Sequence, residues 1–155
     1  MIILGIDPGY DRVGIAVIED KSLLHSECFI TSPKDDFHTR LREIGLKINE
    51  IIRQYSPKIL AIESLFITKN QKTAMKVAEA RGVISYEAAK ANMGIHEYSP
   101  PQIKVAVTGH GASDKSQIIK MIPLLIKMKN KKALDDEYDA IAVAITCQAH
   151  IGSKL

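Results

Sequence analysis

The sequence predicts an α/β fold in which a five-stranded mixed sheet is flanked by helices. Short apolar runs near the amino terminus indicate strands joined by tight turns, and apolar residues then recur at helical spacing. From there on, predicted strands alternate with predicted helices. Strands joined by a hairpin pair antiparallel, whereas strands joined through a helix are parallel, so the sheet should be mixed.

The first third of the chain indicates an antiparallel meander. The run IILGID, residues 2–7, is apolar without alternation and ends in a lone acid, Asp7, as expected for a strand buried on both faces. The turn PGYDR follows this run. We expect three strands, over residues 2–7, about 13–19 and about 23–31.

Two helices and two strands should follow. Apolar residues recur at helical spacing from Leu41 to Tyr55, with Asp35 or Asp36 available as a cap and Pro57 after the end. The run KILAIE is a second apolar segment that ends in one acid, Glu63. We expect helices over about 36–55 and 70–91, and strands over 58–63 and 94–99.

The last third should be helical. A short helix is expected from near Pro101 to Gly109, and Ser113 should cap a further helix that Pro123 kinks or shortens. A final helix is expected over about 135–149. The apolar residues that it should bury are Ile141, Ala142 and Ile145.

Length and composition predict one globular domain over residues 1–155. The hydrophobic share of 46% is ordinary, and no apolar stretch approaches the roughly 20 residues that span a bilayer. The first residues already indicate a strand rather than a signal peptide, so we expect a cytoplasmic protein without membrane contact. Cys28 and Cys147 lack C-x-x-C spacing, and we expect both to be buried free thiols.

The net charge of +3 does not by itself demand a nucleic acid partner. Basic residues concentrate in segments 69–81 and 115–132. On charge alone, we interpret both segments as solvated helix faces.

Acidic side chains occupy the ends of two predicted strands and one face of the last helix. Ligands of open α/β sheets bind beyond the carboxyl ends of the strands, where Asp7 and Glu63 lie. Asp136 and Asp139 are three residues apart, so a helix directs them from one face. Asp136 could serve as a partner of the helix dipole, whereas Asp139 lies among apolar residues. The four acids are expected to converge.

Converging carboxylates favour a bound metal, because they repel one another unless cations neutralise them. Oxygen ligands without Cys or His favour Mg²⁺ or Mn²⁺. Two such ions roughly 4 Å apart can activate the attacking water and stabilise the leaving oxygen of a phosphodiester. We therefore predict phosphodiester hydrolysis with Mg²⁺ as cofactor, two ions in each active site, and Mn²⁺ as a substitute.

Other motifs carry less chemistry. The five histidines show no spacing typical of metal ligands, and none is assigned a role. The segment GHGASDKS differs from a P-loop, which needs Gly immediately before its Lys, because Asp114 occupies that position. We interpret it as a glycine-rich entry to a helix, where Lys115 can meet a phosphate.

Five segments, LGIDPG, AIESLFITKN, EARG, GASDKSQ and DEYDAIAVAIT, follow one another over nearly the whole chain. In order and spacing they resemble the motifs of the RuvC-type Holliday junction resolvases, which have a ribonuclease H-like fold. The resemblance implies an endonuclease that resolves four-way junctions during recombination and repair by symmetric, metal-dependent hydrolysis. It also implies the catalytic residues and metal ligands: Asp7, Glu63, Asp136 and Asp139.

The same resemblance implies contacts to DNA. Phe66 matches the family's aromatic residue that stacks on a base near the crossover. Lys104 and Lys115 match basic positions near the cleaved strand. Lys69, in a lysine-rich loop, is a further candidate, and Arg81 is either structural or in contact with phosphate.

The family implies a homodimer, since a two-fold protein suits a two-fold junction. In a bacterium, the expected partners besides junction DNA are branch-migration motor proteins of the RuvA/RuvB type. Two features depart from the family pattern: Asp11 beside Arg12, which leaves the local DNA contacts open, and the unusually lysine-rich loop ITKNQKT.

Three alternatives are weaker. The RuvX or YqgF branch of the same fold shares the opening motif but lacks the AIESLFITKN and EARG pattern. An actin-like or sugar-kinase-like ATPase needs two such domains, and this chain supplies one. A catalytically silent junction-binding module would have no reason to retain all four acids.

Overall fold

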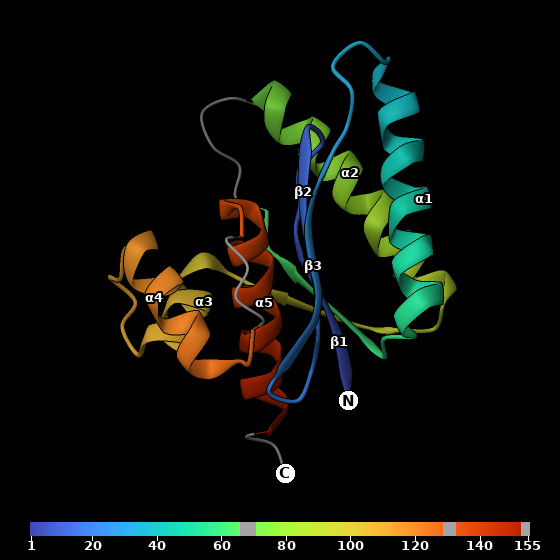
Figure 1. Ribbon diagram of the computed structural model, residues 1–155. Coiled ribbons are helices and arrows are strands. Elements are labelled where there is room, and N and C mark those ends of the chain that lie inside the picture. The colour runs from blue at the N-terminus through green and yellow to red at the C-terminus, as the bar shows by residue number, and fades with distance from the viewer. Residues whose placement is uncertain (66–70, 129–132, 153–155) are drawn as a thin grey trace.

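The computed structural model describes residues 1–65, 71–128 and 133–152, and it confirms the predicted mixed sheet between helices (Figure 1). The strand order is β3-β2-β1-β4-β5. The first three strands form an antiparallel meander, whereas β4 runs parallel to both β1 and β5. The bounds are β1 (Ile2–Asp7), β2 (Arg12–Glu19), β3 (Ser22–Ile30), β4 (Ile59–Glu63) and β5 (Gly94–Tyr98).

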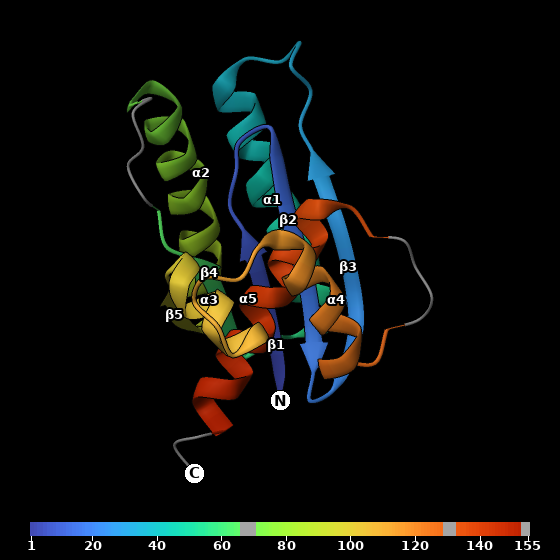
Figure 2. The ribbon, with the colours of Figure 1, turned by 90° about the vertical axis from the view of Figure 1, so that its left-hand side faces the viewer.

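Helices cover both faces of the sheet (Figures 1 and 2). Side chains alternate along a strand, so Leu4 and Ile6 join the core beneath α1 and α2, whereas Ile3 joins the core beneath α5. None of the helices in the described ranges is both long and apolar enough to cross a membrane. The bounds are α1 (Phe37–Tyr55), α2 (Gln71–Lys90), α3 (Pro100–Thr108), α4 (Lys115–Leu125) and α5 (Asp135–Gly152).

The helix ends match the sequence expectations except at one cap. Asp36 caps α1 by accepting a hydrogen bond from the backbone N–H of Thr39 at 3.0 Å. The expected cap at Ser113 is wrong, because Asp114 accepts from the backbone N–H of Gln117 at 2.9 Å and thereby caps α4. A cap must reach the first turn of its own helix. Ser113 cannot do so, since its buried hydroxyl lies 2.6 Å from the hydroxyl of Thr108.

Helix α5 lies directly on the backbone of β1 and β2. A Cβ added at Gly5 would stand 2.4 Å from the carbonyl oxygen of Ala140, and one at Gly14 would stand 2.1 Å from that of Asp136. No side chain fits in either position. The two glycines therefore allow the helix to approach the sheet closely, and they fix the height of its first turn above the ends of β1 and β4.

We predict that Gly14→Ala lowers the free energy of unfolding by about 1–3 kcal/mol, because the added methyl group forces α5 away from β2. Urea denaturation measures this change. Gly82→Ala is the matched control: no atom lies within 4 Å of its added Cβ, and Ala is the better helix former, so stability should hold or rise. Equal stability of the Gly14→Ala variant and the wild type would contradict the close approach.

Candidate active site

Asp7 and Glu63 stand at the carboxyl ends of neighbouring parallel strands. The last registered pair between β1 and β4 is Ile6 with Ile62, so each acid is the next residue after that pair. Asp7 also lies two residues beyond Gly5, which contacts α5, and side chains of a strand alternate. The carboxylate of Asp7 is therefore on the face that α5 covers.

Helix α5 brings its two acids to the same place. A Cβ at Gly14 would stand 3.1 Å from the Cβ of Asp7, so the first turn of α5 and the end of β1 are in contact across this glycine. Burial, reinforced by the charges of Asp139, Glu63 and Asp136, raises the pKa of Asp7 to about 7. Burial and the charge of Asp139 also raise the pKa of Glu63. The four sequence-predicted acids thus lie close enough to repel one another.

Two basic side chains partly neutralise this cluster. The ammonium of Lys115 lies 2.7 Å from the carboxylate of Asp139 and 3.6 Å from that of Asp135. Burial opposes the charged form of Lys115, but these partners outweigh it and raise its pKa. The guanidinium of Arg12 pairs with Asp136.

Arg12 was missed as a site residue by sequence reasoning. The signal for it was the hairpin register: Asp7 pairs with Gly14, so a residue at the start of β2 lies just beyond the end of β1. The neighbouring acid, Asp11, turns away and pairs with Arg40. Arg12 is therefore free of Asp11 and faces the acid cluster.

Two hollows flank Lys115. One, of about 290 Å³, is lined by Lys115 together with Glu63, Asp139 and Lys104. The other, of about 430 Å³, is lined by Lys115 together with Arg12 and Asp136. Lys104 and Lys115, both predicted to contact DNA, thus stand beside the acids.

The donor set fits a hard divalent cation. Carboxylate oxygens are the ligands that Mg²⁺ and Mn²⁺ prefer. Burial first, and then the charges of Asp139, Glu63 and Asp136, raise the pKa of Asp7, and a bound cation would relieve this repulsion. As the side chains stand, no three of the described His, Cys, Asp and Glu residues are arranged to hold one ion. Asp136 and Asp139 are instead paired with Arg12 and Lys115.

Arg81, on α2, contacts protein groups. Its Nε donates to the carbonyl oxygen of Glu63 at 3.4 Å, and its guanidinium pairs with Glu97 of β5 at 2.6 Å. These contacts support the structural alternative for Arg81, because they tie the end of β4 to α2 and β5. The predicted DNA contacts Phe66 and Lys69 lie outside the described residues, as do three lysines of the second basic segment, Lys129, Lys131 and Lys132.

The two cysteines differ from each other. Cys147 is buried as expected, but Cys28 is only half-buried, and its thiol lies 3.6 Å from the carboxylate of Asp136. The expectation of a buried Cys28 is therefore wrong. The reason is its position on β3, the outermost strand, where it pairs with Gly14 next to the acid cluster.

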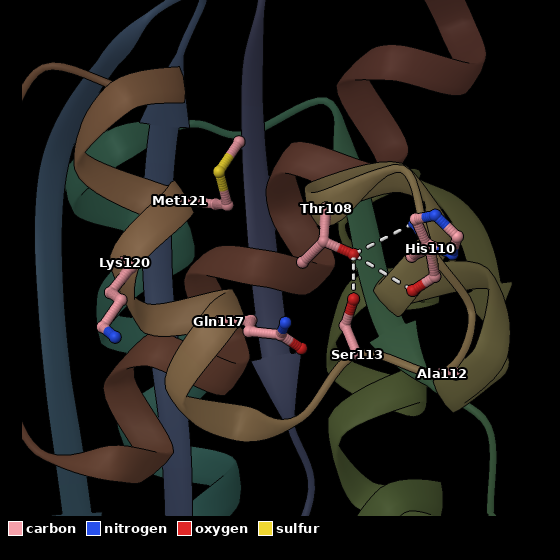
Figure 3. A pocket seen from close by; sticks show the side chains of 7 residues that line it. All are labelled: Thr108, His110, Ala112, Ser113, Gln117, Lys120 and Met121. Carbon is pink, nitrogen blue, oxygen red and sulfur yellow. Dashed lines mark hydrogen bonds between the residues drawn. The ribbon is translucent and has the colours of Figure 1, made fainter.

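A larger hollow, of about 490 Å³, lies between α3 and α4 and contains none of the four acids (Figure 3). On its wall the hydroxyl of Thr108 bonds to Ser113 at 2.6 Å and accepts from the backbone N–H of His110 at 3.1 Å. These bonds fix the turn between the two helices, and Lys115 follows that turn directly. We therefore assign this wall a role in placing Lys115.

Comparison with known proteins identifies the family. Residues 3–147 match the family model described as crossover junction endodeoxyribonuclease RuvC. The chain belongs to the RuvC family. Within that family it is 43% identical to the crossover junction endodeoxyribonuclease RuvC of Petrotoga mobilis, over 93% of this chain and 91% of the relative. It is 41% identical to the RuvC of Alkaliphilus metalliredigens, over 98% and 94% of the two chains.

RuvC structures also match the fold. The T. thermophilus RuvC in complex with Holliday junction substrate superposes with a TM-score of 0.91 at 30% identity, over 99% of this chain and 97% of that one. The yeast mitochondrial Holliday junction resolvase Ydc2, at 13% identity and a TM-score of 0.68, shares the fold. The family match excludes the RuvX or YqgF branch and the ATPase alternatives.

We predict that Asp7→Asn stabilises the metal-free protein above pH 7 by about 1–3 kcal/mol, with a much smaller gain below pH 4. The folded pKa of Asp7 is above its unfolded value, so the wild type loses stability as the pH rises from about 4 to about 7. Urea denaturation in chelator across this range measures the difference. Glu19→Gln, at the opposite end of β2, is the control. If Asp7→Asn raised the free energy of unfolding equally at every pH, the raised pKa of Asp7 would not be the cause.

Proposed function

We propose that this chain is a structure-selective DNA endonuclease that resolves four-way junctions by metal-dependent hydrolysis of phosphodiesters. One observation carries the proposal: four carboxylates from β1, β4 and α5 meet beside Arg12 and Lys115 at one end of the sheet. Acids that hold divalent cations, next to bases that hold phosphate, are the groups that this reaction needs. The RuvC relative from T. thermophilus, solved with a Holliday junction substrate, supports the choice of DNA.

The proposed metal ligands are Asp7, Glu63, Asp136 and Asp139, and the proposed cofactor is Mg²⁺, two ions per site, with Mn²⁺ as a substitute. Bound there, the ions would activate the attacking water and stabilise the leaving oxygen. Glu63 and Asp139 share a hollow with Lys104 and Lys115. We assign these two lysines to the phosphate of the cleaved strand, where ammonium groups bind the non-bridging oxygens.

Other proposed contacts rest on family resemblance. Phe66 is proposed to stack on an unpaired base at the crossover, with Lys69 on the backbone nearby. We further propose a homodimer, in which two identical sites meet the two-fold junction and nick opposing strands. Motor proteins of the RuvA/RuvB type are the proposed partners in a bacterial host.

The first test compares cleavage of a labelled synthetic four-way junction with cleavage of linear duplex of the same sequence, in Mg²⁺, Mn²⁺ or chelator. We expect paired symmetric nicks in the junction alone, and only with metal. Glu63→Gln should lower the cleavage rate at least about a thousandfold while junction affinity changes little, because the substitution removes a metal ligand.

The control for this test is Glu19→Gln, which makes the same charge change on an exposed residue at the far end of β2 and should cut normally. Metal-independent binding without nicks by the wild type would support the silent junction-binding module and overturn the endonuclease proposal. Equal cutting of every branched substrate would remove the junction specificity but retain the nuclease.

The proposed stacking residue has a separate test. Phe66→Ala should slow cleavage of a saturated junction by about tenfold or more, since stacking on one base contributes about 1–3 kcal/mol, while affinity for linear duplex is unchanged. Single-turnover kinetics measures the rate. Phe66→Tyr keeps a stacking ring and should rescue cleavage. A normal rate for Phe66→Ala would refute the role.

A further inference from the structure

Arg12 is a base beside the acid cluster to which the proposed function assigns no specific contact. It begins β2, next to the strand that carries Asp7, and its guanidinium pairs with the carboxylate of Asp136. The paired oxygen of that carboxylate also lies 3.6 Å from the thiol of Cys28. Arg12 therefore places a positive charge at an oxygen that a cation would also use, and the two charges compete for it.

The ion pair of Arg12 is more open to water than that of Arg40, although Arg12 also contacts the thiol of Cys28. The side chain of Arg40 is 10% exposed, and besides pairing with Asp11 it donates to the hydroxyl of Thr31 at 2.8 Å. Such a buried, multiply bonded guanidinium is a fixed part of the fold. The side chain of Arg12 is 47% exposed and its carboxylate partner 24% exposed. Ion pairs this open to water are weak and readily replaced.

Charge and position indicate where Arg12 goes when it leaves Asp136. Arg12 lines the hollow of about 430 Å³ together with Lys115. When cations bind the acids, Coulomb repulsion disfavours the guanidinium at Asp136. A phosphate entering the hollow would then offer Arg12 two oxygens in the bidentate geometry that guanidinium groups prefer.

We propose that Arg12 is an exchangeable counter-ion of the acid cluster: it occupies Asp136 in the metal-free protein, competes with the divalent cation for that carboxylate, and contacts a DNA phosphate once the cation has bound. The second half of this exchange rests on the proposed function. The first half concerns the protein and the metal alone. In the metal-free protein, the positive charge of Arg12 thereby reduces the repulsion between the four carboxylates.

The first experiment is a titration of Mn²⁺ into the protein without DNA, with free Mn²⁺ measured by electron paramagnetic resonance. Arg12→Ala should lower the apparent Kd for Mn²⁺ by about three- to fivefold, because the competing charge is gone. Arg12→Lys should fall between this variant and the wild type. Arg42→Ala, which removes the same charge from an exposed site on α1, should leave the Kd unchanged.

Either of two results would overturn the competition. An unchanged Kd in Arg12→Ala would show that Arg12 does not occupy a metal-binding oxygen. A weaker Kd would show that Arg12 supports the metal site. Because this titration contains no DNA, its failure is distinguishable from failure of the endonuclease proposal.

The second experiment measures the salt dependence of junction binding in Ca²⁺, in samples checked for the absence of cleavage, and in chelator. Loss of one phosphate contact should reduce the slope of log K against log salt by about 0.9. We expect this reduction for Arg12→Ala in Ca²⁺ and a smaller one in chelator, where Arg12 remains on Asp136. Equal reductions in both conditions, or none, would overturn the exchange.

Discussion

The rest of the structure depends on how closely α5 lies on β1 and β2. Gly5 and Gly14 remove the side chains that would otherwise hold the helix away from the sheet, so helix backbone meets strand backbone. This contact determines the site, because two of the four acids are on the helix and the other two are at strand ends. A helix held farther from the sheet would carry its acids away from Asp7. Packing on this face thus sets the positions of charges rather than stability alone.

Once packing has brought the four acids together, the charges around them determine how strongly they repel one another. Four carboxylates repel one another strongly in a half-buried site. Arg12 of β2 and Lys115 at the start of α4 pair with two of them and partly neutralise the charge. The base from α4 depends on the hydrogen-bonded turn at Thr108 and Ser113, since that turn sets where the helix begins. Arg81 has a comparable effect on the other side, where it ties the end of β4 to its neighbours. Groups on β2, α2, α3 and α4 therefore hold the acids in place or pair with their charges.

The sequence predicted the fold and the four acids because both leave local signals. Unbroken apolar runs that end in one acid indicate buried strands with functional ends, and Asp139 among apolar helix residues has no structural explanation. The counter-charge of Arg12 was missed although the hairpin register places it beyond the end of β1, because its partner is distant in sequence and its neighbour Asp11 offered a nearer one. The cap was misassigned between Ser113 and Asp114 because both residue types cap helices, and only the tertiary bond to Thr108 separates them. Cys28 was misjudged because its local sequence is apolar while its strand lies at the sheet edge.

The acid cluster also bears on how this family can be engineered. Like charges held together destabilise the fold, and the proposed reaction requires them, so stability and the proposed activity oppose each other at this site. A redesign that selected only for thermal stability would replace Asp7 or Glu63 early, and the resulting protein would keep the α/β architecture without the proposed metal ligands. Variant libraries of this fold should therefore keep Asp7 and Glu63 fixed. Selection for stability alone should produce stable variants that lack these acids.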